Sequence, residues 1–346
     1  MNRLVILELH HLGDAVMALP FLRGAQEKFR VTVVSRPAVA ELLRATTNGI
    51  EILAAEPSWR GRIRQMRALR LGKKDVTASV WADTRVHLLM AASRAGVRVG
   101  FPMTERNYYA AEVPWRRRRL VAGKALAAFS AIFIPLLTCP LSRQSASQHH
   151  MEDWEQIARS LGFSPYVNPP WTSSFPPAPD QIATFVSSQA GRHVVLVHPG
   201  GRLPAKRWPF FPDLLHSLAR QDNLAVIIVC PPGESAPTPA GPRQITFEAR
   251  GWPELLGALS LSDAVICNDS VAGHLAAALG KPVVAIFGSG NPDWFAPWGN
   301  RSLVAVPERT SLYPFIDHGV PDSSIQLHSI AVPLVESRLR TALDAG

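Results

Sequence analysis

The sequence predicts an α/β protein of two doubly wound domains that face each other, each a parallel sheet covered by helices. Three observations support this prediction. Apolar strand-like runs alternate with helical periodicity in both halves, a proline-rich stretch separates the halves, and short polar or glycine-containing loops follow several strands. Such loops lie at the carboxyl edge of a parallel sheet, where open α/β sheets bind ligands.

The first half alternates strands and helices from its start. The apolar run 4–9 leads through a glycine-containing loop into a helix over 15–29, in which Val16, Leu19 and Leu22 share one face. One glycine is too few for the three-glycine dinucleotide fingerprint, which argues against NAD binding. Further strands are predicted at 31–35, 50–53, 76–82 and 97–101, and helices at 38–45, 59–71 and 86–95.

The second half repeats this alternation after a linker. Strands are predicted at 193–197, 225–230, 265–267 and 283–287, and helices at 213–220, 254–261, 272–279 and 325–343. Six prolines stiffen the segment 164–180. We therefore expect an N-terminal domain over 1–164, a linker over 165–180 and a C-terminal domain over 181–346.

Composition limits the class of protein. A chain of 346 residues, 47% of them hydrophobic, can bury two cores and is not disordered. Three widely spaced cysteines in or beside apolar segments predict neither a disulfide framework nor a zinc site, and they fit a reducing cytoplasm. The run 125–137 is too short to span a bilayer, so we expect a buried helix there rather than one on a membrane surface. We also expect no secretion signal.

The net charge of +9 predicts anionic partners. Nucleic-acid-binding signatures are absent from the sequence, so we predict no nucleic acid partner. Two basic clusters stand out, one with Arg60, Arg64 and Arg67 on the helix 59–71 and one that begins at Arg116 and Arg117. Each cluster is either a solvated face or an anion-binding face, because arginine binds phosphate and carboxylate bidentately. As binding faces they would hold an anionic acceptor or dock the chain on a membrane that presents it.

Candidate site residues follow strands in both halves. Asp14, after Gly13, lies at the first strand-to-helix junction, where it either caps the helix or acts as a general base. In the second half, Gly200 and Gly201 allow backbone N–H groups to turn toward an anion, and Lys206 adds a cation to the same loop. Asp269 and Ser270 precede the helix 272–279, whose N-terminus either is simply capped or binds an anion. We predict no metal site, since the adjacent histidines at 149 and 150 point in different directions on a helix.

Several of these motifs occur together in one known family. The run Asn268–Asp269–Ser270, then His274 with the small residues up to Gly280, resembles the C-terminal signature of family 9 glycosyltransferases, the ADP-heptose heptosyltransferases of lipopolysaccharide core assembly. The pair Gly13–Asp14 resembles the family's opening, and the tail Lys206–Pro209 resembles its Lys, aromatic, Pro motif. The family usually has Gly where this chain has Val271, and Gly lets backbone approach a phosphate closely.

The resemblance implies a fold, a reaction and roles for these residues. The fold would be GT-B, two facing Rossmann-like domains, with the acceptor on the first and a nucleotide sugar on the second. The reaction would be an inverting, metal-independent transfer of heptose from ADP-heptose to an anionic saccharide or glycolipid such as the lipopolysaccharide inner core, without a cofactor. Asp14 would be the base, Lys206 would contact the diphosphate, and Glu234 would bind the ribose.

Two alternatives remain open at the level of sequence. A glycosyltransferase of the same fold could use another nucleotide sugar or acceptor. A non-catalytic nucleotide-binding or membrane-docking protein could also keep the fold, as Val271 in place of Gly suggests. In either case we expect a cytoplasmic protein, with peripheral contact to the inner membrane as the membrane-docking option.

Overall fold

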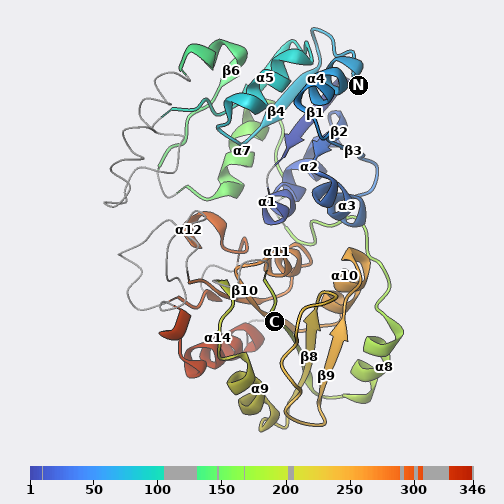
Figure 1. The fold of residues 1–346 in the computed structure, drawn as a ribbon, viewed down its shortest axis with the longest axis vertical. Coiled ribbons are helices and arrows are strands. Elements are labelled where there is room, and N and C mark those ends of the chain that lie inside the picture. The colour runs from blue at the N-terminus through green and yellow to red at the C-terminus, as the bar shows by residue number, and fades with distance from the viewer. Residues whose placement is uncertain are drawn as a thin grey trace. The chain divides into compact units, whose positions relative to one another are not determined.

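The structure is a computed structural model and describes residues 1–9, 11–104, 131–145, 148–166, 168–201, 206–288, 292–299, 303–306 and 327–344. The chain divides into two compact units, Met1–Trp171 and Thr172–Gly346. Within each unit, a central sheet carries helices on its faces (Figure 1). Every strand pairing among the described residues is parallel. The predicted α/β class with two parallel sheets is confirmed.

The N-terminal unit has a six-stranded sheet in the order β3-β2-β1-β4-β5-β6. Its strands are β1 (Arg3–Glu8), β2 (Arg30–Ser35), β3 (Glu51–Ala54), β4 (Val76–Ser79), β5 (Val97–Gly100) and β6 (Cys139–Pro140). Its helices are α1 (Leu12–Met17), α2 (Leu19–Ala25), α3 (Pro37–Thr46), α4 (Trp59–Ala68), α5 (Thr84–Ala92), the 3-10 helix η2 (Ala131–Leu136) and α7 (His150–Ser160).

Alternate residues of β1 point to opposite faces, and both faces are buried by helices. Val5 and Leu7 pack with Met66 of α4 and Leu89 of α5 in one core. Helices α1 and α2 follow β1, and α3 follows β2. Helix α1 contacts α3, and α7 contacts both α1 and α2. Helices α4 and α5 therefore form one layer of the unit.

Two predicted helices of this unit differ in the structure. The helix expected over 15–29 begins at Leu12 and is divided at Ala18 into α1 and α2, because Pro20 has no N–H to donate to the preceding turn. The buried helix expected over 125–137 is wrong for its described part. Residues 131–136 form a 3-10 helix that contains Pro135 and leaves Ile132 69% exposed. Residues 125–130 lie outside the described ranges.

The C-terminal unit has a five-stranded sheet in the order β11-β10-β7-β8-β9. Its strands are β7 (His193–His198), β8 (Leu224–Cys230), β9 (Gln244–Glu248), β10 (Ala264–Asn268) and β11 (Val283–Ile286). Its helices are α8 (Asp180–Ser188), α9 (Phe211–Ala219), α10 (Trp252–Ser260), α11 (Val271–Ala278), α12 (Pro292–Phe295) and α14 (Val332–Asp344). Leu214 of α9 and Leu339 of α14 share one core with Val195 and Ile266 of the sheet, while α10 contacts α11.

None of the helices in the described ranges has the length and apolar character that a membrane span requires.

His87 on α5 gives a testable acid dependence of stability. Its side chain is 2% exposed, and burial lowers the pKa of His87 from 6.5 to about 4, although the Asp83 charge opposes this shift. Between pH 6.5 and pH 4, His87 is protonated in the unfolded chain but stays neutral in the folded chain. Stability therefore falls as the pH drops from 6.5 to 4, by about 3 kcal/mol for this group. Urea unfolding over this range should show a shallower loss for His87→Leu, while exposed His216→Gln should follow the unmodified protein. Equal slopes for all three proteins would contradict the assignment.

Candidate functional site

In each sheet the strand order reverses at one point, and the candidate residues gather there. The reversal lies between β1 and β4 in the N-terminal unit and between β7 and β10 in the C-terminal unit. Ligands of open α/β sheets bind outside the carboxyl ends of the strands at such a point. Asp14 follows β1, Gly200 and Gly201 follow β7, and Asp269 and Ser270 follow β10.

Asn268, the last residue of β10, joins the two loops of the C-terminal unit. Its side chain is fully buried. The amide oxygen accepts from the backbone N–H of Trp208 at 3.0 Å, and the amide nitrogen donates to the carbonyls of Pro199 at 2.7 Å and Gly200 at 3.2 Å. These bonds cross between β7 and β10, so Asn268 fixes the glycine loop and the Lys206–Trp208 segment against the start of α11.

Replacing Asn268 should therefore weaken the C-terminal unit strongly. Asn268→Ala leaves the Trp208 N–H and two carbonyls without this partner in a buried site, which should lower the free energy of unfolding by about 2–4 kcal/mol. The measurement is chemical unfolding followed by tryptophan fluorescence. Asn223→Ala changes an exposed asparagine of the same unit and should shift stability by less than about 0.5 kcal/mol. An Asn268→Ala protein as stable as Asn223→Ala would show that these bonds do not hold the loops.

Lys206 and Asp269 bring the two loops of the C-terminal unit into direct contact. The Lys206 ammonium lies 2.5 Å from a carboxylate oxygen of Asp269. The side chains are 28% and 13% exposed, so the pair is shielded but reachable. The backbone thus places a cation beside the N-terminal end of α11, where the helix dipole is positive. Phosphate oxygens are the groups that such a site binds best.

The glycine loop leaves room for Glu234. A Cβ atom at Gly200 would lie 2.8 Å from a carboxylate oxygen of Glu234 and 3.2 Å from the His198 ring. The same carboxylate lies 3.4 Å from the guanidinium of Arg207, which also donates to the carbonyl of Gly201 at 2.7 Å. Burial lowers the pKa of His198, although the Glu234 charge opposes the shift. Glu234 thus belongs to the same cluster as the glycine loop.

Helix α11 begins directly at the candidate loop. Ser270 is its extended N-cap residue, Val271 is its first residue, and His274 is buried one turn further on. Val271 has no positive φ, so the backbone here does not require glycine. A Cβ atom at Gly273 would lie 2.8 Å from the sulfur of Cys267. This close approach packs α11 against β10, which holds the N-terminus of the helix at the sheet edge.

In the N-terminal unit, Gly13 and Asp14 lie in the first turn of α1, not in a loop as expected. Asp14 is 5% exposed, and its carboxylate accepts from the backbone N–H of His11 at 3.1 Å. This bond satisfies one of the first N–H groups of the segment. Asp14 therefore caps the helix through one carboxylate oxygen. The other oxygen is not used in this cap, so the catalytic interpretation stays a prediction.

A buried polar cluster near the carboxyl ends of β1, β4 and β5 was not predicted. The Trp81 indole donates to Glu8 at 3.2 Å, and its ring centre lies 5.0 Å from that of His150. His150 and Arg143 both contact Asp153, at 3.3 and 2.7 Å. Burial alone would raise the pKa of Asp153, but the hydrogen bond with His150 and the charge of Arg143 hold this pKa below its ordinary value. A charged cluster therefore lies at the end of β1, from which the chain continues into α1 and Asp14.

The arginines predicted to bind the acceptor are only partly described. Arg60, Arg64 and Arg67 are exposed along α4. Because α4 follows β3 and precedes β4 in a parallel sheet, it runs from the carboxyl edge toward the amino edge. Arg60 is therefore the nearest of the three to the loop edge, and Arg67 is about 10 Å further along the helix. Arg116 and Arg117 lie outside the described residues.

The two buried cysteines of the C-terminal unit offer no reactive thiol. Cys139, Cys230 and Cys267 are free. Burial raises the pKa of Cys230 to about 11 and that of Cys267 to about 12, with a further rise from Glu234 and Asp269 respectively. Both thiols are therefore protonated near pH 7 and are poor nucleophiles. Within the described ranges, no three His, Cys, Asp or Glu side chains form a group that could hold a metal ion.

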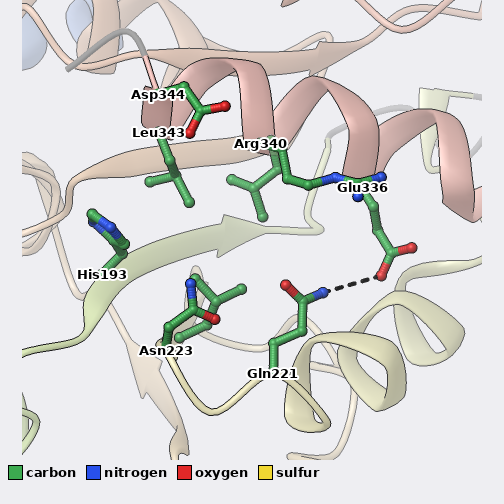
Figure 2. A pocket seen from close by; sticks show the side chains of 9 residues that line it. His193, Gln221, Asn223, Glu336, Arg340, Leu343 and Asp344 are labelled. Atoms are coloured by element: carbon green, nitrogen blue, oxygen red, sulfur yellow. Dashed lines mark hydrogen bonds between the residues drawn. The ribbon is translucent and has the colours of Figure 1, made fainter.

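A small pocket lies at the opposite edge of the C-terminal sheet. It is lined by His193 and Leu224, at the starts of β7 and β8, and by Arg340 and Asp344 of α14. Figure 2 shows Gln221 turned toward Glu336 across it, with 3.5 Å between the bonded atoms. The pocket lies at the amino ends of the strands, away from the switch point, and we do not assign it to the candidate site.

Comparisons with known proteins agree with this architecture. A family model described as "Glycosyltransferase family 9 (heptosyltransferase)" matches residues 125–312, just over half of the chain. Lipopolysaccharide heptosyltransferase 3 of Escherichia coli is 20% identical over 244 residues, which span 69% of this chain and 66% of that protein, slightly under two thirds of its length.

Two solved structures share the fold over nearly the whole chain. E. coli ADP-heptose lps heptosyltransferase II has a TM-score of 0.64 at 16% identity, with 99% of both chains covered. E. coli heptosyltransferase WaaC with ADP-2-deoxy-2-fluoro heptose has a TM-score of 0.63 at 16% identity, with 98% of this chain and 99% of that chain covered. The two parallel sheets with their flanking helices are therefore those of a GT-B fold.

Proposed function

Because the chain belongs to glycosyltransferase family 9, we propose that it transfers a heptose from ADP-heptose to an anionic saccharide acceptor such as the lipopolysaccharide inner core. One observation supports this proposal above the others. At the switch point of the C-terminal sheet, a glycine loop, the Lys206 cation and the N-terminus of α11 lie together, and Asn268 holds them in place. Such a group suits the diphosphate of a nucleotide sugar.

The C-terminal unit would bind the donor. Lys206 and the first N–H groups of α11, after Asp269 and Ser270, would hold the diphosphate, with Gly200 and Gly201 bringing backbone close to it. Glu234 beside the glycine loop would accept hydrogen bonds from the ribose hydroxyls. Val271 and His274 would line the same helix end. The solved relative named with ADP-2-deoxy-2-fluoro heptose supports an ADP-linked donor for this chain.

The N-terminal unit would bind the acceptor and supply the general base. The Asp14 carboxylate would take the proton of the acceptor hydroxyl while that oxygen attacks the anomeric carbon. The bond from the anomeric carbon to the diphosphate then breaks, and ADP leaves with the electron pair. A single displacement of this kind inverts the anomeric configuration. Lys206 and the helix N-terminus would stabilise the charge that grows on the departing phosphate, so the scheme needs no metal ion.

The acceptor would be held by cations and by the first turn of α1 around Gly13. Arg60, with the nearest position to the loop edge, would contact an anionic group of the acceptor first, and Arg64 and Arg67 would contact groups further from the reacting hydroxyl. Arg116 and Arg117 would add to this set. Lipopolysaccharide heptosyltransferase 3, which aligns with part of this chain, supports a glycolipid acceptor of this kind.

One departure favours an alternative. Val271 places a half-buried side chain where a glycine would let backbone approach a phosphate. A protein that keeps the fold for nucleotide binding or membrane docking without turnover would tolerate this change more easily.

Calorimetric binding without added metal tests the proposal. We expect ADP and ADP-heptose to bind more tightly than UDP and GDP. Transfer from ADP-heptose should then persist in the presence of a chelator, and the product should have the inverted configuration by NMR. Preference for UDP or GDP would keep the fold and change the sugar. Binding of none of the four ligands would favour the non-catalytic alternative.

A further inference from the structure

The outer surface of α4, α5 and η2, here called the α4–α5 face, concentrates the positive charge of the chain. Residues 56–96 contain nine Lys and Arg residues and three Asp and Glu residues, a net charge of +6 within a chain of net charge +9. The nine cations are Arg60, Arg62, Arg64, Arg67, Arg70, Lys73, Lys74, Arg85 and Arg94. One segment thus carries two thirds of the net charge.

Most of this charge is not neutralised within the described part of the chain. Asp75 is bound by Arg3 at 2.7 Å, and Asp83 is bound by Arg85 at 3.1 Å, so two of the three acids are already occupied. Eight of the nine cations form no ion pair with a described residue: Arg60, Arg62, Arg64, Arg67, Arg70, Lys73, Lys74 and Arg94. The face therefore attracts anions over its whole length.

Exposed apolar side chains lie on the same layer. Trp59 at the start of α4 is 39% exposed, Leu88 of α5 is 36% exposed and Ile132 of η2 is 69% exposed. Helix α5 contacts both α4 and η2, so the three elements are neighbours. Neither water nor a soluble polyanion would bury these large apolar side chains. A bilayer would, because the boundary between headgroups and acyl chains takes up apolar side chains while the headgroups contact the neighbouring cations.

From these observations we infer that the α4–α5 face docks on a bilayer that carries anionic lipid headgroups. Among the cations of this face that are not assigned to the acceptor, Arg70, Lys73, Lys74 and Arg94 contact the headgroups, and Trp59, Leu88 and Ile132 enter the headgroup region. The direction of α4 separates this role from acceptor binding. Lys73 and Lys74 lie between the end of α4 and the start of β4, at the amino edge of the sheet and away from Asp14. These two cations are too distant from the carboxyl edge, where Asp14 lies, to hold the reacting part of an acceptor.

Sedimentation with vesicles tests the inference on the full chain, without donor or acceptor, so its outcome is independent of the transferase proposal. The unmodified protein should bind phosphatidylcholine vesicles that contain one third phosphatidylglycerol, and should not bind pure phosphatidylcholine. Lys73→Gln with Lys74→Gln should weaken binding about fivefold per removed cation. Trp59→Ser with Leu88→Ser and Ile132→Ser should weaken binding by about tenfold or more.

Matched variants on other surfaces serve as controls. Phe175→Ser removes a side chain that is 60% exposed but lies outside this face, and Arg220→Gln removes an exposed arginine of the C-terminal unit. Both should bind vesicles as the unmodified protein does. No binding to the anionic vesicles, or equal loss in the control variants, would overturn the inference. A triple apolar variant that binds normally while the lysine variant is weakened would also overturn it, because charge alone would then account for the vesicle binding.

Discussion

Asp14→Asn is expected to lower the rate of heptose transfer by about 10²–10⁴-fold, because it removes the carboxylate proposed to accept the proton of the attacking hydroxyl. The substitution is matched to the structure. The side-chain oxygen of Asn can still accept from the backbone N–H of His11, as the Asp14 carboxylate does at 3.1 Å. The helix cap is therefore kept while the base is lost. ADP release from ADP-heptose with an inner-core acceptor measures the rate.

Two further measurements separate catalysis from capping at this position. Calorimetric binding of ADP to Asp14→Asn should equal that of the unmodified protein, since the proposed donor site lies in the other unit. Asp14→Ala should lose about 1 kcal/mol of stability through the missing cap, while Asp14→Asn should lose less. Unchanged turnover in Asp14→Asn would reduce Asp14 to a helix cap and remove the basis for the proposed reaction.

Lys206→Met is expected to lower turnover by about 10²–10³-fold, the effect typical of removing one group that stabilises transition-state charge. The ammonium lies 2.5 Å from Asp269 at the switch point of the C-terminal sheet. Without it, the departing diphosphate of the proposed reaction would lose this cation and would meet an Asp269 carboxylate that has lost its partner. ADP affinity, measured by calorimetry, should fall together with the rate.

The double substitution Lys206→Met with Asp269→Asn separates the loss of the cation from the repulsion by Asp269. If repulsion by Asp269 causes the loss of ADP affinity, the double variant should recover part of it, but turnover should stay low because the cation is still absent. Arg207→Met changes the neighbouring cation, which contacts Glu234 instead, and should affect ADP affinity less. An active Lys206→Met protein would contradict the assignment of Lys206 to the diphosphate.

The alternation of strands and helices could be predicted from the sequence because periodicity is a local property. The apolar runs that became β1, β2, β7, β8 and β10 are continuous and buried on both faces, which is the pattern of parallel strands. Several of the elements that were not predicted are short or atypical, although α8 is a regular helix of nine residues. Strand β6 has two residues and contains Pro140, and β9 follows a proline-rich loop. The break in the first helix depended on Pro20, which the periodic pattern did not take into account.

The site could be predicted only in part, because sequence motifs mark loops but not their partners. Glycines and a lysine after β7 indicated an anion site, yet the fixing role of Asn268 depends on residues 60 to 69 positions away. Trp81 was assigned to the strand 76–82, whose apolar run continues past the actual end of β4 at Ser79. The contacts of Trp81 with Glu8 and His150 arise from the fold alone. No local pattern could have indicated them.

The separate cores of the two units affect how the stability of this protein is to be read. One core is formed by β1 with α4 and α5, and the other by β7 and β10 with α9 and α14. A chain with two such cores does not satisfy the two-state approximation by default. A substitution such as Asn268→Ala shifts the cooperative transition of its own unit, and one such as His87→Leu shifts the other. A single midpoint for the whole chain would average two quantities, so each unit needs its own spectroscopic probe.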